Sequence, residues 1–238
     1  MHRSIALAVR QLYELEVPKP QDIEGCPCCI STEQISALLA TPLPEITLDQ
    51  MRPYARNVLS TVGSEADFRY FWPRMAELMV TAPSFGQFEE PELLLDRLRL
   101  ADWSSWPDGE RRATERYLAA LIERLADEPL CPSEVNAWVC AVSQASDDVT
   151  PLLDGALVHD TPASAHNLYA LYDWSRRKIE KRNTLFGSFW GLQGINSDGS
   201  FVNPNVARIV AWFQLPHVSR AVDRAYAAES LTERPLGT

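Results

Sequence analysis

The chain has 238 residues, of which 46% are hydrophobic and 23% charged, so it can fold around one large core or two smaller ones and is not globally disordered. Its 32 acidic and 22 basic side chains give a net charge of −10, and a field of that sign repels nucleic-acid phosphates and anionic membrane surfaces. No stretch approaches the ~20 uninterrupted apolar residues of a membrane span. We therefore expect neither nucleic acid nor a membrane as a partner.

The cysteine count and the first residues bear on the compartment. Five cysteines are an odd number, in a chain too long to depend on disulfides. The opening stretch MHRSIALAVRQLYELEV has the spacing of an amphipathic helix, and no small-residue cleavage site follows it. We expect a cytoplasmic protein with reduced thiols.

The first predicted helices after this stretch begin at two capping boxes. In ISTEQISALLA, Ser31 can cap the helix while Gln34 reaches back to it, and in ITLDQM the same arrangement recurs with Thr47 and Gln50. Pro53 lies too deep for a first turn, so it predicts a kink or a delayed start of the second helix.

A predicted helix rich in aromatic residues comes next. Ser64 is a suitable cap, and Pro73 interrupts the run, which predicts a kink or two short helices. The apolar residues at helical spacing are Phe68, Phe71, Trp72, Met75, Leu78 and Met79.

Proline punctuates most of the remaining predicted helices. A long amphipathic helix begins at Asp108 and ends before Pro129, and another opens at Ser133. Proline is favoured in the first turn of a helix, after a capping side chain. Further starts are predicted at Pro91, Pro151, Pro162, Pro204 and Pro216.

This inventory predicts an all-α fold of about ten short helices. No segment alternates with the period of two that a half-buried strand requires. The helices suit either an irregular helical bundle or a HEAT-like array of stacked helix pairs. A glycine-interrupted aromatic stretch between Lys181 and Gly199 suggests a main domain over 1–182 and a C-terminal subdomain over 183–238, unless the two form one continuous domain.

Three segments together resemble an uncharacterised family of helical bacterial proteins. These are CPCCIS from Cys26, the Asp-Phe-Arg-x-Phe-x-Pro-Arg pattern from Asp67 to Arg74, and the Trp-x-x-Trp-Pro pattern from Trp103 to Pro107. The similarity covers roughly the middle half of the chain. It implies a bacterial, helical protein and assigns no activity, so it assigns no functional residue either.

The segment GCPCCIST is the densest group of reactive side chains. Cys26, Cys28 and Cys29 form a C-x-C-C arrangement, whereas structural zinc sites commonly have two to four residues between paired cysteines. Three interpretations stay open: small apolar side chains packed ahead of a helix, a zinc or copper(I) site, and a redox or nucleophilic thiol near a helix N-terminus. Packing is favoured, with metal binding next. A fourth metal ligand would come from Cys131, Cys140, His2, His159, His166 or His217.

Motifs of the common enzyme classes are missing. The sequence has no G-x-S-x-G, no G-x-x-x-x-G-K, no H-E-x-x-H and no G-x-G-x-x-G. The leading hypothesis is therefore a non-enzymatic helical module that binds a protein partner. Its acidity suggests that it neutralises or scaffolds a basic protein, in the manner of an immunity protein. Arginine and aromatic side chains often anchor interfaces, which makes Arg69, Trp72, Arg74, Phe189 and Trp190 the candidate partner-binding residues. The alternative function is metal binding at Cys26, Cys28 and Cys29, with zinc or copper as the cofactor.

Overall fold

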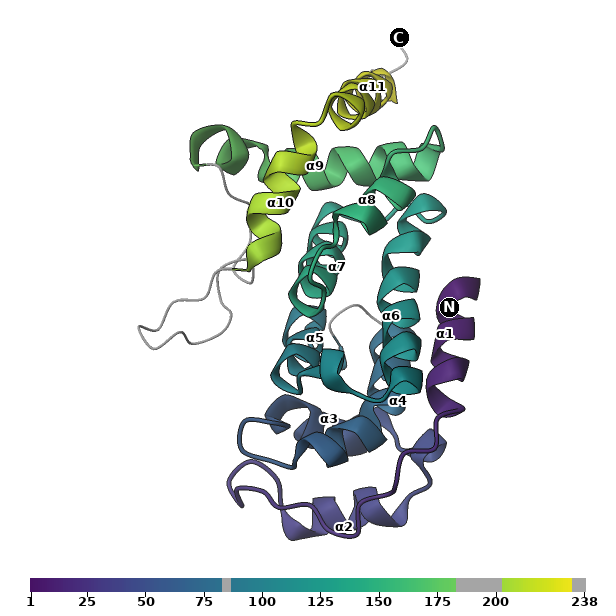
Figure 1. Cartoon of the computed structure of the whole chain (residues 1–238), viewed down its shortest axis with the longest axis vertical. Coiled ribbons are helices and arrows are strands. Elements are labelled where there is room, and N and C mark those ends of the chain that lie inside the picture. Colours follow the sequence, from purple (N-terminus) through teal and green to yellow (C-terminus); the bar gives the residue numbers. More distant parts are fainter. Residues whose placement is uncertain (83–86, 183–202, 233–238) are drawn as a thin grey trace, which may run out of the picture. The chain divides into compact units, whose positions relative to one another are not determined.

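A computed structural model describes residues 1–82, 87–182 and 203–232 (Figure 1). Within these ranges the side chains of 176–182, Pro204 and 229–232 are not described. The described residues form eleven α-helices and no strand, so the all-α prediction is confirmed. A regular repeat of helix pairs stays a prediction.

The chain divides into two compact units, Met1–Tyr117 and Leu118–Thr238. The division expected from the sequence, at residue 182, falls inside the second unit. The glycine-interrupted stretch that suggested it lies mostly within 183–202, outside the described residues.

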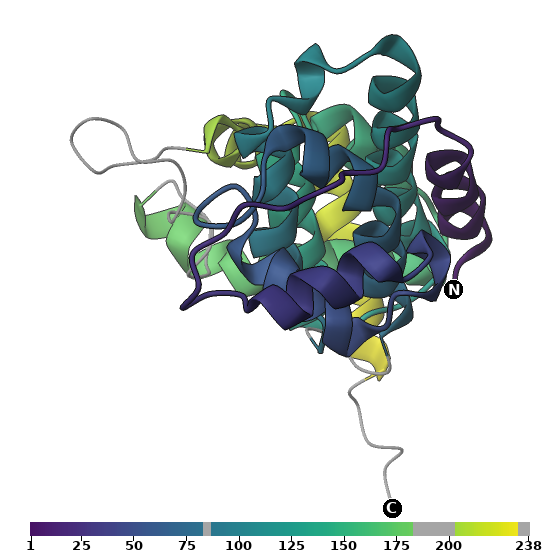
Figure 2. The same cartoon turned by 90° about the horizontal axis from the view of Figure 1, so that it is seen from below.

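Helix α4 organises the first unit. Helix α1 packs along α4, α2 packs on α3, and α3 contacts both α4 and α5. An extended segment between α1 and α2 crosses this unit (Figure 2). The bounds are α1 Arg3–Tyr13, α2 Thr32–Ala40, α3 Leu48–Asn57, α4 Glu65–Thr81, α5 Pro91–Leu100 and α6 Asp108–Glu123, the last continuing past the end of the unit.

Local sequence signals place the starts of these helices correctly. Both predicted capping boxes form, Ser31 with Gln34 and Thr47 with Gln50. Helix α3 begins directly after Thr47, so Pro53 does not delay its start. The alternative of two short helices around Pro73 is wrong, because α4 is continuous from Glu65 to Thr81. An interior proline costs about 3 kcal/mol, and the buried side chains on either side of it compensate for this cost.

Aromatic side chains form the core beneath α4. The ring of Trp72 meets Tyr117 edge-on at 5.6 Å and stacks on Phe68 at 5.8 Å between ring centroids. Phe71 packs on Tyr54 at 4.9 Å. The hydroxyl of Tyr117 donates to the carbonyl oxygen of Ala76 at 2.8 Å, which satisfies its polar end inside the core. All five rings are buried.

Helix α9 organises the second unit and packs against α7, α8 and α11. Buried amides close its loops: Asn167 donates to the carbonyl oxygens of Leu125 and Glu128, and Asn205 to those of Ser143 and Ser146. Most helices here begin at a predicted proline. The bounds are η3 Arg124–Ala126, α7 Pro132–Ala145, α8 Thr150–Leu157, α9 Pro162–Arg182, α10 Pro204–Phe213 and α11 Pro216–Thr232.

Candidate metal centre

Cys26, Cys28 and Cys29 lie on one tight turn ahead of α2, which we call the cysteine turn (residues 26–29). The backbone N–H of Cys29 donates to the carbonyl oxygen of Cys26 at 2.8 Å, which closes a four-residue β-turn. Pro27 occupies the second position, where its fixed φ favours the turn. The turn therefore brings the two end cysteines together and holds Cys28 between them.

The chain reverses direction after α3, at residues 58–62, where the backbone N–H of Leu59 donates to Val62 O at 3.0 Å. We call this tight reversal the hairpin, and it supports the first half of the cysteine turn. Cys26 donates its backbone N–H to Thr61 O at 2.9 Å, and Gly63 donates to Glu24 O at 2.7 Å, on either side of a bridge between Gly25 and Val62. Gly25 is required here, because a Cβ at this position would lie 2.9 Å from the side chain of Ile30 and 3.3 Å from that of Val62.

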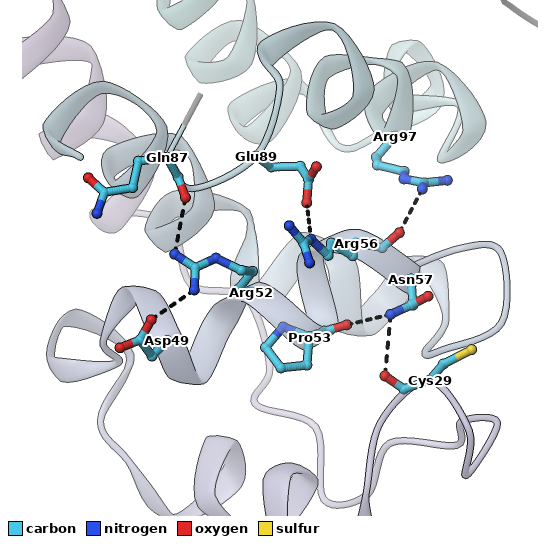
Figure 3. A network of polar contacts seen from close by, with 9 residues as sticks. All are labelled: Cys29, Asp49, Arg52, Pro53, Arg56, Asn57, Gln87, Glu89 and Arg97. Carbon is cyan, nitrogen blue, oxygen red and sulfur yellow. Dashed lines mark hydrogen bonds and ion pairs between the residues drawn. The ribbon is translucent and has the colours of Figure 1, made fainter. Parts of the chain in front are cut away.

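Asn57, the last residue of α3, supports the second half. Its amide nitrogen donates to Cys29 O at 3.3 Å and to Pro53 O at 2.8 Å (Figure 3). Its backbone carbonyl accepts from the N–H groups of Thr61 and Val62, at 3.0 and 3.1 Å. Asn57 is thus hydrogen-bonded to Cys29 directly and is linked to Cys26 through Thr61 of the hairpin.

Arginine side chains fix this end of α3 to the chain around α5. Arg56 pairs with Glu89 at 2.9 Å, and Arg97 donates to the backbone carbonyl of Arg56 at 3.0 Å (Figure 3). Arg52 bridges Asp49 and the carbonyl of Gln87. These long-range bonds hold Asn57 in place beneath the cysteine turn.

The three sulfur atoms all lie within 4.8 Å of one another. The Sγ atoms of Cys28 and Cys29 are 3.7 Å apart, and those of Cys26 and Cys28 are 2.7 Å apart, longer than a disulfide bond of about 2.05 Å. Two sulfurs on a tetrahedral zinc ion lie about 3.8 Å apart, from a Zn–S bond of about 2.3 Å. The Cys28–Cys29 spacing already fits a bound zinc ion, and the Cys26–Cys28 spacing would widen by about 1 Å on the same geometry.

The thiols perturb one another electrostatically. The hydrogen bond from Cys28 lowers the pKa of the Cys26 thiol. The same bond raises the pKa of Cys28 to about 11, because losing its proton breaks the bond and places a second negative charge beside Cys26. A cation bound between them removes this repulsion and favours both thiolates.

The cysteine turn is open to solvent. Cys28 is exposed, and Cys26 and Cys29 are half-buried. The favoured expectation, packing as small apolar side chains, is therefore wrong for Cys28. Buried aliphatic residues take that role instead, because Ile23, Ile30, Val58 and Val62 form the apolar base of the turn and hairpin.

The sequence carries a spacing signal for this site. Cys26 and Cys29 alone have the C-x-x-C spacing of a metal knuckle, with Pro27 in the turn. Reading the segment as C-x-C-C hides this pair. Asn57 carries no sequence signal, because it is 28 residues away from the cysteine that it supports.

Of the predicted fourth ligands, only His2 lies in the first unit with the cysteine turn, and it contacts Ser4 instead. Among the described His, Cys, Asp and Glu side chains, only the three cysteines of the turn form a group of metal-binding geometry. The other candidates have contacts of their own: His2 with Ser4, Cys131 with Ser133, Cys140 with Gln144, His159 with Gly155 O, His166 with Leu130 O and His217 with Asp154.

The predicted partner-binding residues on α4 are used inside the first unit. Trp72 is 1% exposed and belongs to the core. Arg69 forms a two-pronged ion pair with Glu110, at 2.6 and 2.7 Å. Arg74 donates to Ile46 O at 2.7 Å and pairs with Glu77. Their expected role at a surface was drawn from residue type alone, and the structure places their functional atoms against the protein itself.

The other two candidate partner-binding residues, Phe189 and Trp190, lie outside the described residues.

The two segments behind the family resemblance on α4 and before α6 meet in the first unit. Phe68 packs on Trp106 at 6.0 Å between ring centroids, and the guanidinium of Arg69 lies over the same indole. The indole N–H of Trp106 donates to Ala101 O at 3.1 Å. The aromatic and arginine residues of these two segments therefore stabilise the first unit by packing on one another.

The chain matches no family of known proteins, no curated protein and no solved structure at a significant level. The resemblance to a bacterial family stays a prediction. Among the described helices, none combines the length and apolar character needed to traverse a lipid bilayer.

Proposed function

We propose that this protein binds a thiophilic metal ion, zinc or copper(I), through Cys26, Cys28 and Cys29. The observation that carries the proposal is the convergence of three thiols within 4.8 Å on an exposed turn. Thiolates are the ligands that zinc and copper(I) prefer in proteins.

The support around the cysteine turn favours a ligand site over an incidental cluster. Its backbone is held by the hairpin at Cys26 and by Asn57 at Cys29. Side chains behind metal ligands orient them in this way and tune their affinity. The site also requires reduced thiols, which suits the cytoplasmic location expected from the cysteine content.

Metal analysis of the purified full chain tests this function. We expect one zinc or copper ion per chain after reconstitution under reducing conditions, and none in the double variant Cys26→Ser, Cys28→Ser. Cys131→Ser is the matched control, because Cys131 is also exposed but lies in the second unit. A wild-type chain that retains neither metal, or a double variant that retains it fully, would contradict the proposal.

A protein-binding module for a basic partner is the second candidate. Two observations favour it: the net charge of −10, and two exposed leucines, Leu93 and Leu100, which are seven residues apart on α5 and hence on one helix face. Since α4 uses Arg69, Trp72 and Arg74 internally, we place the docking surface on α5.

Site-specific crosslinking tests that second candidate. A photoreactive residue at position 93 should capture a basic protein, and salt should suppress the capture because charge attraction is screened. The control is the same residue at position 7, because Leu7 is also an exposed leucine, on α1. Equal capture at both positions, or capture of proteins irrespective of charge, counts against this candidate.

A further inference from the structure

The ligand count of the cysteine turn narrows the choice of metal, on the basis that the proposed function is correct. The chain has five cysteines and four histidines, and all nine lie in the described ranges. Only Cys26, Cys28 and Cys29 converge. Within the first unit the only other cysteine or histidine is His2, which contacts Ser4, so this unit supplies three soft donors and all three are thiols.

Zinc and copper(I) differ in what three thiols can offer them. A structural zinc ion is almost always bound by four protein ligands in a tetrahedron. Copper(I) is a soft monovalent ion, which thiolates select, and it is stable with three sulfur ligands in a plane. Three thiolates therefore complete the coordination of copper(I) and leave that of zinc one ligand short.

The spacing of the sulfurs favours three ligands over two. Cys28 lies 2.7 Å from Cys26 and 3.7 Å from Cys29, so an ion held by the outer pair would also contact the middle sulfur. We infer that Cys26, Cys28 and Cys29 together bind one copper(I) ion in three-coordinate, all-thiolate geometry. Each thiol that binds releases its proton to solvent, and the oxidation state of the ion does not change.

X-ray absorption on the full chain loaded anaerobically with copper(I) tests this geometry. The expected result is one copper per monomer with three sulfur neighbours, and zinc-loaded protein should show three sulfurs plus one oxygen donor from solvent. A copper site with two sulfurs, a zinc site with four protein ligands, or copper that bridges two chains would each overturn the inference.

Single substitutions provide the second measurement. Cys26→Ser, Cys28→Ser and Cys29→Ser should each lower copper(I) affinity at least tenfold, measured by competition with a chromophoric copper(I) chelator, while Cys131→Ser should leave it unchanged. If one of the three can be replaced without loss, the three-sulfur geometry is wrong and the proposed metal binding survives. If the wild-type chain binds neither ion, the proposed function fails as well.

Discussion

Helix α4 and the cysteine turn are both candidate sites in the sequence, and they differ in the partners of their polar side chains. On α4 the arginine side chains are paired within the protein: Arg69 with Glu110 and Arg74 with Glu77. At the cysteine turn the backbone is hydrogen-bonded to the protein, whereas among the described side chains the thiols form hydrogen bonds only with one another. A group whose bonding capacity is used internally stabilises the fold, whereas one left accessible is available to a ligand.

The largest effect should follow from removing a core side chain of α4. Trp72→Ala should lower the free energy of unfolding by about 3–5 kcal/mol, because it leaves a large cavity among packed rings. Urea unfolding followed by circular dichroism measures this. Trp174→Ala on α9 is the control, since Trp174 is 39% exposed and its loss should cost about 1 kcal/mol or less. If both substitutions lowered the unfolding free energy equally, the Trp72 side chain would contribute no more to stability than an exposed tryptophan.

Glu92 is a buried polar side chain that differs from the paired residues of α4. One of its carboxylate oxygens has no hydrogen-bond partner among the described residues. Burial raises its pKa to about 7, from an ordinary value of 4.5. The folded state then holds a proton that the unfolded state releases, so stability falls as pH rises from about 4.5 to about 7.

Unfolding free energies across this pH window measure the effect. The loss attributable to Glu92 should be about 3 kcal/mol, and it should disappear in Glu92→Gln, which keeps the shape without the charge. Parallel pH profiles for the wild type and this variant would show that the buried carboxyl does not titrate as we expect.

Arg69 tests whether its ion pair is structural. Arg69→Met should cost about 2 kcal/mol, because the carboxylate of Glu110, whose side chain is 12% exposed, loses its partner. The matched control is Arg111→Met on α6, whose partners Asp108 and Glu115 are solvated; its loss should cost about 0.5 kcal/mol. If urea unfolding gave equal losses of free energy for the two variants, Arg69 would stabilise the fold no more than a surface arginine does.

Asn57 tests the support of the cysteine turn. Asn57→Asp removes both amide donations and adds negative charge beside the thiolates, so metal affinity should fall roughly 10- to 100-fold. Chelator competition measures this. Ser60→Asp adds a charge to the same hairpin without removing the bond to Cys29, and we expect it to bind metal within a few-fold of the wild type. Similar losses in the two variants would assign the effect to charge alone.

The smallest effect is expected at the cysteine turn without metal. Cys28→Ser should change the unfolding free energy of the metal-free protein by less than about 0.5 kcal/mol, because the side chain is exposed. With metal present, the wild type should gain more stability than the variant, since a ligand that binds the folded state more tightly shifts the equilibrium further toward it. A large loss of unfolding free energy in the metal-free variant would show that the Cys28 side chain stabilises the fold.

Secondary structure was predictable where local chemistry decides it. Ser31 with Gln34 and Thr47 with Gln50 satisfy backbone N–H groups within one turn, so their capping boxes could be identified from spacing alone. Continuity through Pro73 was not predictable in this way. It depends on what the neighbouring side chains Trp72 and Met75 bury, and that is decided by distant parts of the chain.

The candidate site was predictable in its ligands but not in its surroundings. Three cysteines in four positions must lie close together, and the sequence suffices to place them. Their exposure was misjudged, because burial depends on the hairpin around Val62 and on Ile30, which take the apolar positions instead. The role of Asn57 also depends on a contact across 28 residues.

The sequence by itself determined the helical character of this protein, most of its helix starts and the proximity of three thiols. These are short-range properties, set by bonds within about one turn of backbone. Only the tertiary structure decided that Arg69 is paired with Glu110 while Cys28 is left exposed. The physical reason is that desolvation and pairing depend on which residues meet in space, and residues 41 positions apart meet only after folding.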